Sequence, residues 1–170
     1  MRVLAAAVHA RSAVEIGTGS GVGSLYLLSG MHPDGVLTTI DPEVENQRAA
    51  REAFAEARIR TPRVRTIAGQ PRDVVGRLTD HAYDLVSFPA HAPHAEELLE
   101  HARRLLRPGG VLVIPHALFH DRVADPAARD ATTRAVRGLL RAVSEAEDLV
   151  PALTGSGDGV LAAVLRPRKG

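Results

Sequence analysis

Short apolar runs alternate along the chain with longer amphipathic segments. The short runs are rich in Val, Ile and Leu and border on Gly, Pro or Asp, a pattern typical of buried strands. The expected strands are residues 13–16, 36–40, 64–68, 83–88, 111–114, 149–153 and 160–165. The alternation predicts an α/β fold with a doubly wound, mostly parallel sheet. The last two strands flank the glycine-rich residues 155–159, which predicts a C-terminal antiparallel hairpin.

The longer segments repeat their apolar residues with the helical period. Between Ala95 and Leu106 they fall on one stripe, and this helix is expected to stop at the Arg-Pro-Gly-Gly sequence of residues 107–110. A second stripe runs from Ala128 to Val143, and a more polar helix is expected over residues 43–59. No repeat or linker interrupts the pattern. Residues 1–170 are therefore expected to form one domain.

Composition narrows the classes of function. The 170 residues carry a net charge of only +1, which favours neither nucleic acid nor an anionic membrane as a partner. There is no cysteine, so disulfides, thiolate zinc sites and a cysteine nucleophile are excluded. Residues 1–10 resemble a signal peptide only superficially, because their apolar run is too short, and no run is long enough to span a bilayer. We expect a cytoplasmic protein.

Glycines at alternate positions follow the first strand. Residues 15–23 read Glu-Ile-Gly-Thr-Gly-Ser-Gly-Val-Gly, where glycine permits a tight turn and close approach of a ligand to the backbone. Asp41 ends the next strand, where an acid can accept hydrogen bonds from ribose hydroxyls. A plain strand–helix turn is the alternative. Val22 stands where a dinucleotide fingerprint needs glycine, which disfavours a nicotinamide oxidoreductase, and no P-loop lysine follows.

The loop resembles the E/D-x-G-x-G-x-G motif of S-adenosylmethionine-dependent methyltransferases. From Ala13 to Arg166 the chain is similar to the catechol O-methyltransferase-like family (O-methyltransferase family 3), particularly its bacterial branch, and the resemblance implies a Rossmann-like class I fold. The stretches that carry it are residues 14–21, 33–42, 83–86, 105–113, 122–126 and 157–159.

The resemblance implies S-adenosyl-L-methionine as cofactor, a small-molecule acceptor and a homodimer. The glycine loop would line the methionine part with Glu15 supporting it, Asp41 would hold the ribose, and residues 69–71 would pass beside the adenine. The residues expected at the cofactor are Glu15, Gly17, Thr18, Gly19, Gly21, Ser24, Asp41, Pro42, Gly69, Gln70, Pro71 and Pro89.

The chain departs from the family where the family binds its divalent metal. Family members have an aspartate after the fourth strand and an Asp-Asn pair after the fifth; here Pro89 stands at the first position, and Pro115 and His116 stand at the pair. Proline offers no ligand, so no magnesium or calcium site is expected. Ala92 replaces the catalytic lysine, and the only lysine is Lys169. The helices that precede the first strand in the family are expected to be reduced to residues 1–11.

Four histidines follow these two strands, namely His91, His94, His116 and His120. Loops at the carboxyl ends of parallel strands meet, so these side chains are expected near the same site. Three readings stay open: solvated loop residues, a general base (His116 or His91), or a transition-metal site. The predicted function is O-methylation of a small molecule, with a phenol as candidate acceptor and without a magnesium site. The alternative is a degenerate relative that binds S-adenosylmethionine or S-adenosylhomocysteine without turnover, as a sensor or dimer partner.

Overall fold

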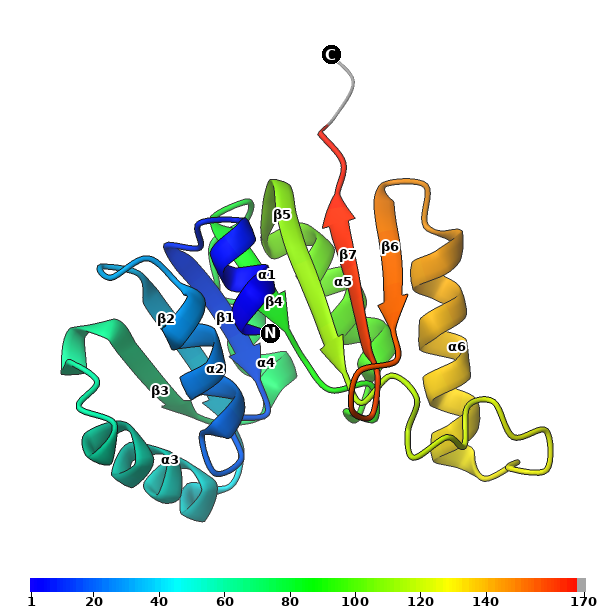
Figure 1. Cartoon of the computed structure of the whole chain (residues 1–170), viewed down its shortest axis with the longest axis horizontal. Coiled ribbons are helices and arrows are strands. Elements are labelled where there is room, and N and C mark those ends of the chain that lie inside the picture. Colours follow the sequence, from blue (N-terminus) through cyan, green and yellow to red (C-terminus); the bar gives the residue numbers. More distant parts are fainter. Residues whose placement is uncertain (168–170) are drawn as a thin grey trace.

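Seven strands form one sheet in the computed structural model, which describes residues 1–167 (Figure 1). The strands are β1 (Ser12–Ile16), β2 (Val36–Asp41), β3 (Val64–Ala68), β4 (Tyr83–Ser87), β5 (Leu106–Pro115), β6 (Leu149–Thr154) and β7 (Val160–Leu165). Their order is β3-β2-β1-β4-β5-β7-β6. The first five run parallel, and β7 is antiparallel to both β5 and β6. The expected mostly parallel sheet with a C-terminal hairpin is confirmed. Lys169 lies outside the described residues.

Helices cover the sheet in two groups. They are α1 (Arg2–Ala7), α2 (Val22–Gly30), α3 (Val44–Glu56), α4 (Pro71–Val75), α5 (Ala95–Leu105) and α6 (Ala131–Glu145), with a single 3-10 turn, η1 (Thr61–Arg63). Contacts link α1 to α2 and α2 to α3, and separately α4 to α5 and α5 to α6. In Figure 1, α1 and α2 lie in front of β1 and β2, while α5 lies behind β5 and β7. Residues 1–11 thus contribute one short helix.

Each group of helices has its own hydrophobic core. Leu98 and Val136, from α5 and α6, pack into one core with residues of the central strands. Leu27 and Leu28, from α2, pack into the other with Ala5. Because the central strands are buried on both faces, their sequences are apolar runs rather than alternating ones.

The starts of β5 and α6 are among the element boundaries that differ from the prediction. The helix α5 ends as expected, but β5 begins at Leu106, so the Arg-Pro-Gly-Gly sequence belongs to the strand. Leu106 pairs with Tyr83, and the register then shifts before the next pairs form. The helix α6 begins at Ala131 rather than near Ala128, because the Asp130 side chain caps it by accepting the Thr133 N–H at 2.9 Å.

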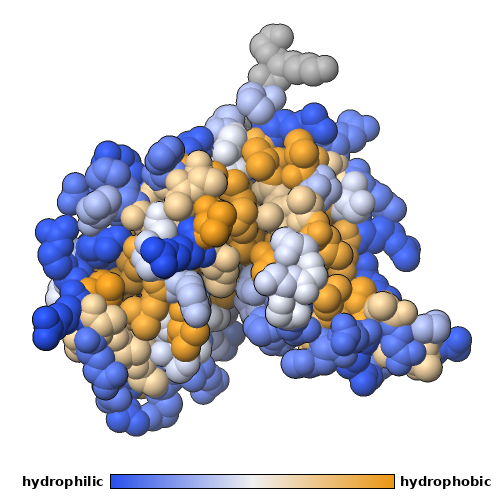
Figure 2. All heavy atoms as spheres, in the orientation of Figure 1, coloured by the Kyte–Doolittle hydropathy of each residue, from blue (hydrophilic) through white to orange (hydrophobic). Residues whose placement is uncertain are grey.

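The front of β7 and β6 stays open among residues 1–167, with no helix over it in Figure 1. Val150 and Val164, a cross-strand pair, are 46% and 40% exposed there. Figure 2 shows apolar side chains on this face of the molecule. Within residues 1–167, none of the helices has the length and apolar character needed to cross a membrane.

Candidate active site

Two adjoining cavities lie at the carboxyl ends of the parallel strands, where ligands bind in open α/β sheets. The first has a volume of about 320 Å³ and is lined by Pro42, Gln70 and Pro71, among others. The second, of about 460 Å³, is lined by residues that include Glu15, Gly19, Asp41, Pro115 and His116. Both share Ile16, Gly17, Pro89 and His91. We call the two together the groove.

The glycine loop forms one wall of the groove. Gly17, Gly19 and Gly21 have φ of 88°, 50° and 88°, values that side chains disfavour. A Cβ at Gly17 would lie 3.5 Å from the Pro89 ring, and one at Gly19 would meet nothing within 4 Å. Gly19 therefore faces open space, whereas Gly17 faces the Pro89 ring. Gly21 instead faces α3, since its Cβ would be 3.0 Å from the Ala50 Cα.

Asp41 ties the loop to the end of β2. One carboxylate oxygen accepts the Gly19 N–H at 2.9 Å, and the other accepts the Glu43 N–H at 2.9 Å and the Asn46 amide at 3.1 Å. The residue is only 4% exposed yet lines the second cavity. Asn46, which the sequence did not single out, lies in the first turn of α3.

A buried polar network lies beneath the loop. The Glu15 carboxylate accepts hydrogen bonds from the Ser24 hydroxyl and, at 2.8 Å, from the Thr39 hydroxyl. The Thr39 and Thr18 hydroxyls are hydrogen-bonded to each other at 2.7 Å, and the Gln47 amide donates a hydrogen bond to the Thr18 hydroxyl at 3.2 Å. Burial raises the pKa of Glu15 to about 7, although the bonds from Ser24 and Thr39 oppose the shift.

This network explains where two of the expected cofactor contacts lie. Ser24 is fully buried and turned toward Glu15, and Thr18 is 3% exposed and turned toward Thr39. Neither lines the groove, and neither does Gly69, whereas the Gln70 and Pro71 that follow it do. Spacing along the chain cannot tell a residue that supports the loop from one that faces the ligand.

The loops after β4 and β5 meet at the second cavity. The Ala90 N–H donates to the Pro115 carbonyl at 2.9 Å, which places the two proline positions side by side. The His91 and His116 rings are 5.6 Å apart, edge to face, and His91 stacks on Phe119 at 5.9 Å. Burial lowers the pKa of His91, and His116 adds to the effect.

The other two histidines lie apart from the second cavity. His94 lines the first cavity only, and the His120 side chain is 78% exposed and lines neither. In residues 1–167, no three His, Cys, Asp or Glu side chains come together in a way that could hold a metal ion. Of the four histidines, His91 and His116 thus face the space beside the glycine loop.

Asp158, at the tip of the β6–β7 hairpin, reaches His116. Its carboxylate lies 3.0 Å from His116 Nδ1, and its other oxygen accepts the His120 N–H at 2.6 Å. Burial would raise the pKa of Asp158, but these hydrogen bonds outweigh it and hold the pKa below its ordinary value. The sequence offered one signal for this residue, an acid between two glycines in a predicted hairpin.

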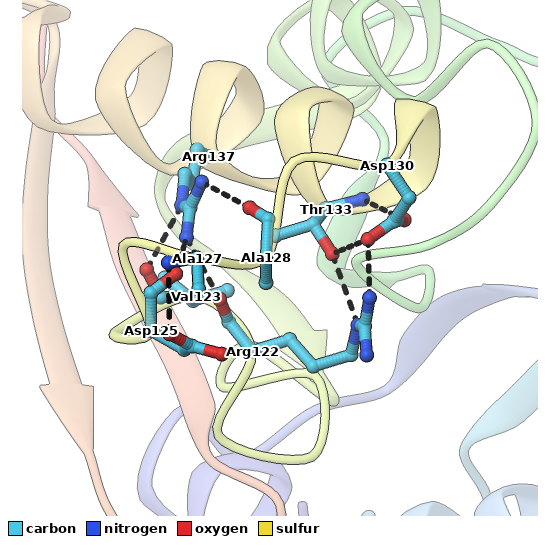
Figure 3. Close-up of polar contacts among 8 residues, drawn as sticks. All are labelled: Arg122, Val123, Asp125, Ala127, Ala128, Asp130, Thr133 and Arg137. Carbon is cyan, nitrogen blue, oxygen red and sulfur yellow. Dashed lines mark hydrogen bonds and ion pairs between the residues drawn. The ribbon is translucent and has the colours of Figure 1, made fainter.

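The irregular segment 116–130 is held by Arg137 of α6. Figure 3 shows the Arg137 guanidinium pointing into this segment. It donates to the carbonyls of Val123 at 2.9 Å, of Ala128 at 2.8 Å and of Arg122 at 2.8 Å, and to that of Asp125. The Arg122 side chain in turn pairs with Asp130 and holds the pKa of that carboxyl well below its usual range. His116 and Phe119 therefore sit on an anchored loop.

Comparison with known proteins agrees with this geometry. Residues 14–121 match the family described as "Methyltransferase domain". A "Putative O-methyltransferase" of Mycobacterium avium (strain 104) is 51% identical over 154 residues, 91% of this chain and 69% of that protein. A crystal structure from Corynebacterium glutamicum superposes with a TM-score of 0.87 at 32% identity, covering 99% of this chain and 79% of the other.

A further solved structure contains the cofactor. The O-methyltransferase TomG from Streptomyces achromogenes, involved in tomaymycin synthesis and solved in complex with S-adenosylmethionine, has a TM-score of 0.83 at 29% identity. The alignment covers 98% of this chain and 78% of TomG. With the glycine loop and the strand order, these matches show that the chain belongs to the class I S-adenosylmethionine-dependent O-methyltransferases.

Proposed function

We propose that this chain transfers a methyl group from S-adenosylmethionine to a hydroxyl oxygen of a small molecule, without a magnesium site and with His116 as proton acceptor. The observation that carries the proposal is the second cavity, where the glycine loop, Asp41 and His116 line one space. It joins the family's cofactor motif to an imidazole, a side chain that often serves as a general base.

The residues of the groove fit the cofactor. The missing side chains of Gly17 and Gly19 leave a cradle, and Gly19 has open space above it. Asp41, at the cavity wall, is placed to accept hydroxyl hydrogen bonds, and Pro42 and Pro71 with Leu98 give the first cavity the apolar walls that a planar base needs. When bound, S-adenosylmethionine supplies the electrophilic methyl group on its sulfonium.

The residues after β4 and β5 do not fit the family's metal. Pro89 and Pro115 lie where that ion would need side-chain oxygens, and an imidazole is a poor ligand for magnesium or calcium. The residues that remain can do other work. The loops orient the acceptor, the proline rings exclude water, and His116 accepts its proton, while the ring of His91 on Phe119 forms a wall for a flat acceptor such as a phenol.

Turnover on a panel of phenols and catechols, with and without EDTA, tests the proposal. We expect methylation that EDTA does not reduce. His116→Ala should lower kcat by about 100-fold or more with cofactor affinity unchanged, because general-base catalysis is worth on the order of 100-fold to 10,000-fold. His101→Ala, a histidine of α5 outside the groove, is the matched control.

Other outcomes point elsewhere. Loss of activity in EDTA with recovery in magnesium alone would refute the metal-free reaction. If zinc restores turnover after EDTA treatment, and His116→Ala abolishes that recovery, the histidines form a metal site. Cofactor binding by calorimetry, without turnover of any acceptor, would favour the binding-protein alternative.

A further inference from the structure

We propose that Asp158 is the positioning residue of this active site: it holds His116 through Nδ1 so that Nε2 is free to take the proton of the acceptor hydroxyl. The inference rests on the proposed function above, in which His116 is the base. It adds a carboxylate from the far end of the chain, 42 residues away from the histidine in sequence.

Backbone contacts fix the position of Asp158 relative to His116. The Ala117 N–H donates to the Gly159 carbonyl at 3.1 Å, and the Leu118 N–H donates to the Asp158 carbonyl at 2.9 Å. A Cβ at Gly159 would come within 2.5 Å of the Leu118 side chain, so only glycine permits this approach. The hairpin tip and the residues after β5 are thus locked together through the main chain, independently of the imidazole.

The His116 backbone is itself unusual. Its φ of 60° lies in the left-handed region, which residues other than glycine adopt uncommonly. Phe119, His120 and Asp121 share such values, at 47°, 54° and 61°. A run of this kind costs free energy and persists only where surrounding contacts hold it. Here the contacts hold the His116 imidazole at the cavity, where it is half exposed and lies against the Asp158 carboxylate.

The pair has a defined chemistry. An ionised carboxylate only accepts hydrogen bonds, so at 3.0 Å the proton of neutral His116 is placed on Nδ1 and the lone pair on Nε2. The acceptor hydroxyl would give its proton to Nε2. Its oxygen would bond the methyl group that bound S-adenosylmethionine supplies, and the cofactor's sulfur would keep the electron pair of the broken carbon–sulfur bond. Asp158 stabilises the imidazolium until it releases the proton to water.

Other titratable groups surround the pair. His91 faces His116 from the loop after β4, and His120 lies on the same loop as His116, 4.0 Å from the Asp158 carboxylate. Glu15 and Asp41 line the same cavity from β1 and β2. Among these groups, the Asp158 carboxylate is the one bonded to His116 Nδ1.

Two readouts on Asp158→Asn test the inference. Nitrogen NMR of the cofactor-free protein should show neutral His116 as the Nδ1–H tautomer in the wild type. In the variant it should show the Nε2–H tautomer, because the asparagine amide donates to Nδ1. Turnover should fall by about 100-fold or more in kcat, with KM and cofactor affinity unchanged. Asp121→Asn, on the same loop and with the same loss of charge, should change neither readout.

The outcomes separate the inference from the proposed function. A His116 tautomer that is the same in the wild type and in Asp158→Asn overturns the inference, as does full turnover in the variant. The expected tautomers in a protein that methylates no acceptor would sustain the positioning role and remove the proposed function. Matching thermal midpoints for the wild type and Asp158→Asn exclude unfolding as the cause of lost turnover. Asp158→Ala removes the carboxylate without adding an amide, and so checks that the tautomer change in Asp158→Asn comes from the asparagine amide.

Discussion

At the scale of single residues, the Asp41 carboxylate already accepts hydrogen bonds from the protein when no ligand is bound. Its oxygens hold the Gly19, Glu43 and Asn46 donors. The carboxylate that would receive the ribose hydroxyls therefore also keeps the glycine loop in its binding shape. One residue links the conformation of the loop to its affinity for the cofactor.

Asp41→Ala should weaken binding of S-adenosylmethionine by on the order of 1.5–3 kcal/mol, the range for hydrogen bonds to a charged group. The variant loses the carboxylate that accepts the ribose hydrogen bonds, and the Gly19 N–H loses its partner. Calorimetry on the wild type and the variant measures the difference in affinity. Asp34→Ala, an exposed acid before β2 that lines neither part of the groove, should bind as the wild type does. Equal affinities for the wild type and Asp41→Ala would refute the role of Asp41.

Glu15 makes folding stability depend on pH. Below pH 4.5 its carboxyl is protonated in both states, whereas between 4.5 and about 7 the unfolded chain loses the proton that the folded chain keeps. The free energy of unfolding therefore falls as pH rises through this window, by roughly 3 kcal/mol in all, and is then constant. Glu15→Gln should lose this pH dependence of the free energy of unfolding.

Urea unfolding at a series of pH values checks the prediction. The stability of Glu15→Gln relative to the wild type should rise between pH 4.5 and 7 and level off above. Glu56→Gln, which changes an exposed glutamate of α3, should show a difference independent of pH. A constant difference for Glu15→Gln would mean that the Glu15 carboxyl is ionised in the folded protein throughout.

At the scale of elements, the segment after β5 is built from turns rather than a helix or strand, and Arg137 of α6 ties it down. Arg137 satisfies four carbonyls of residues 122–128 with one planar guanidinium, which a lysine cannot reproduce. Arg137→Lys should destabilise the fold by on the order of 2 kcal/mol. The effect should be concentrated on this segment and on the residues it presents to the groove.

Hydrogen exchange locates the effect of Arg137→Lys. Amides of residues 117–128 should exchange faster in the variant, turnover should fall, and cofactor affinity should hold because the glycine loop lies elsewhere. Arg134→Lys, an exposed position one turn earlier in α6, serves as the control. Protection that is unchanged at residues 117–128 would show that the β6–β7 hairpin alone anchors the segment.

At the scale of the whole molecule, the sequence predicts what depends on local pattern. The apolar runs locate every strand, and the glycine loop and Asp41 can be read because both belong to one strand–loop–helix–strand unit. The start of β5 could not be predicted from the sequence, because residues 107–110 are typical of a break between two elements. They join the strand only through a register shift against β4. Asp158 could not be assigned either, because its approach to His116 requires β7 to enter between β5 and β6.

That strand order also sets when the site is assembled as the chain is synthesised. A nascent chain that ends before residue 149 already contains the glycine loop, Asp41 and His116, but not β7, which pairs with the free side of β5. When β6 and β7 emerge, β7 must close against a strand made about 50 residues earlier, a long-range contact of the kind that forms slowly. The cofactor cradle can thus form first on the ribosome, and the carboxylate that holds the base arrives with the last strand.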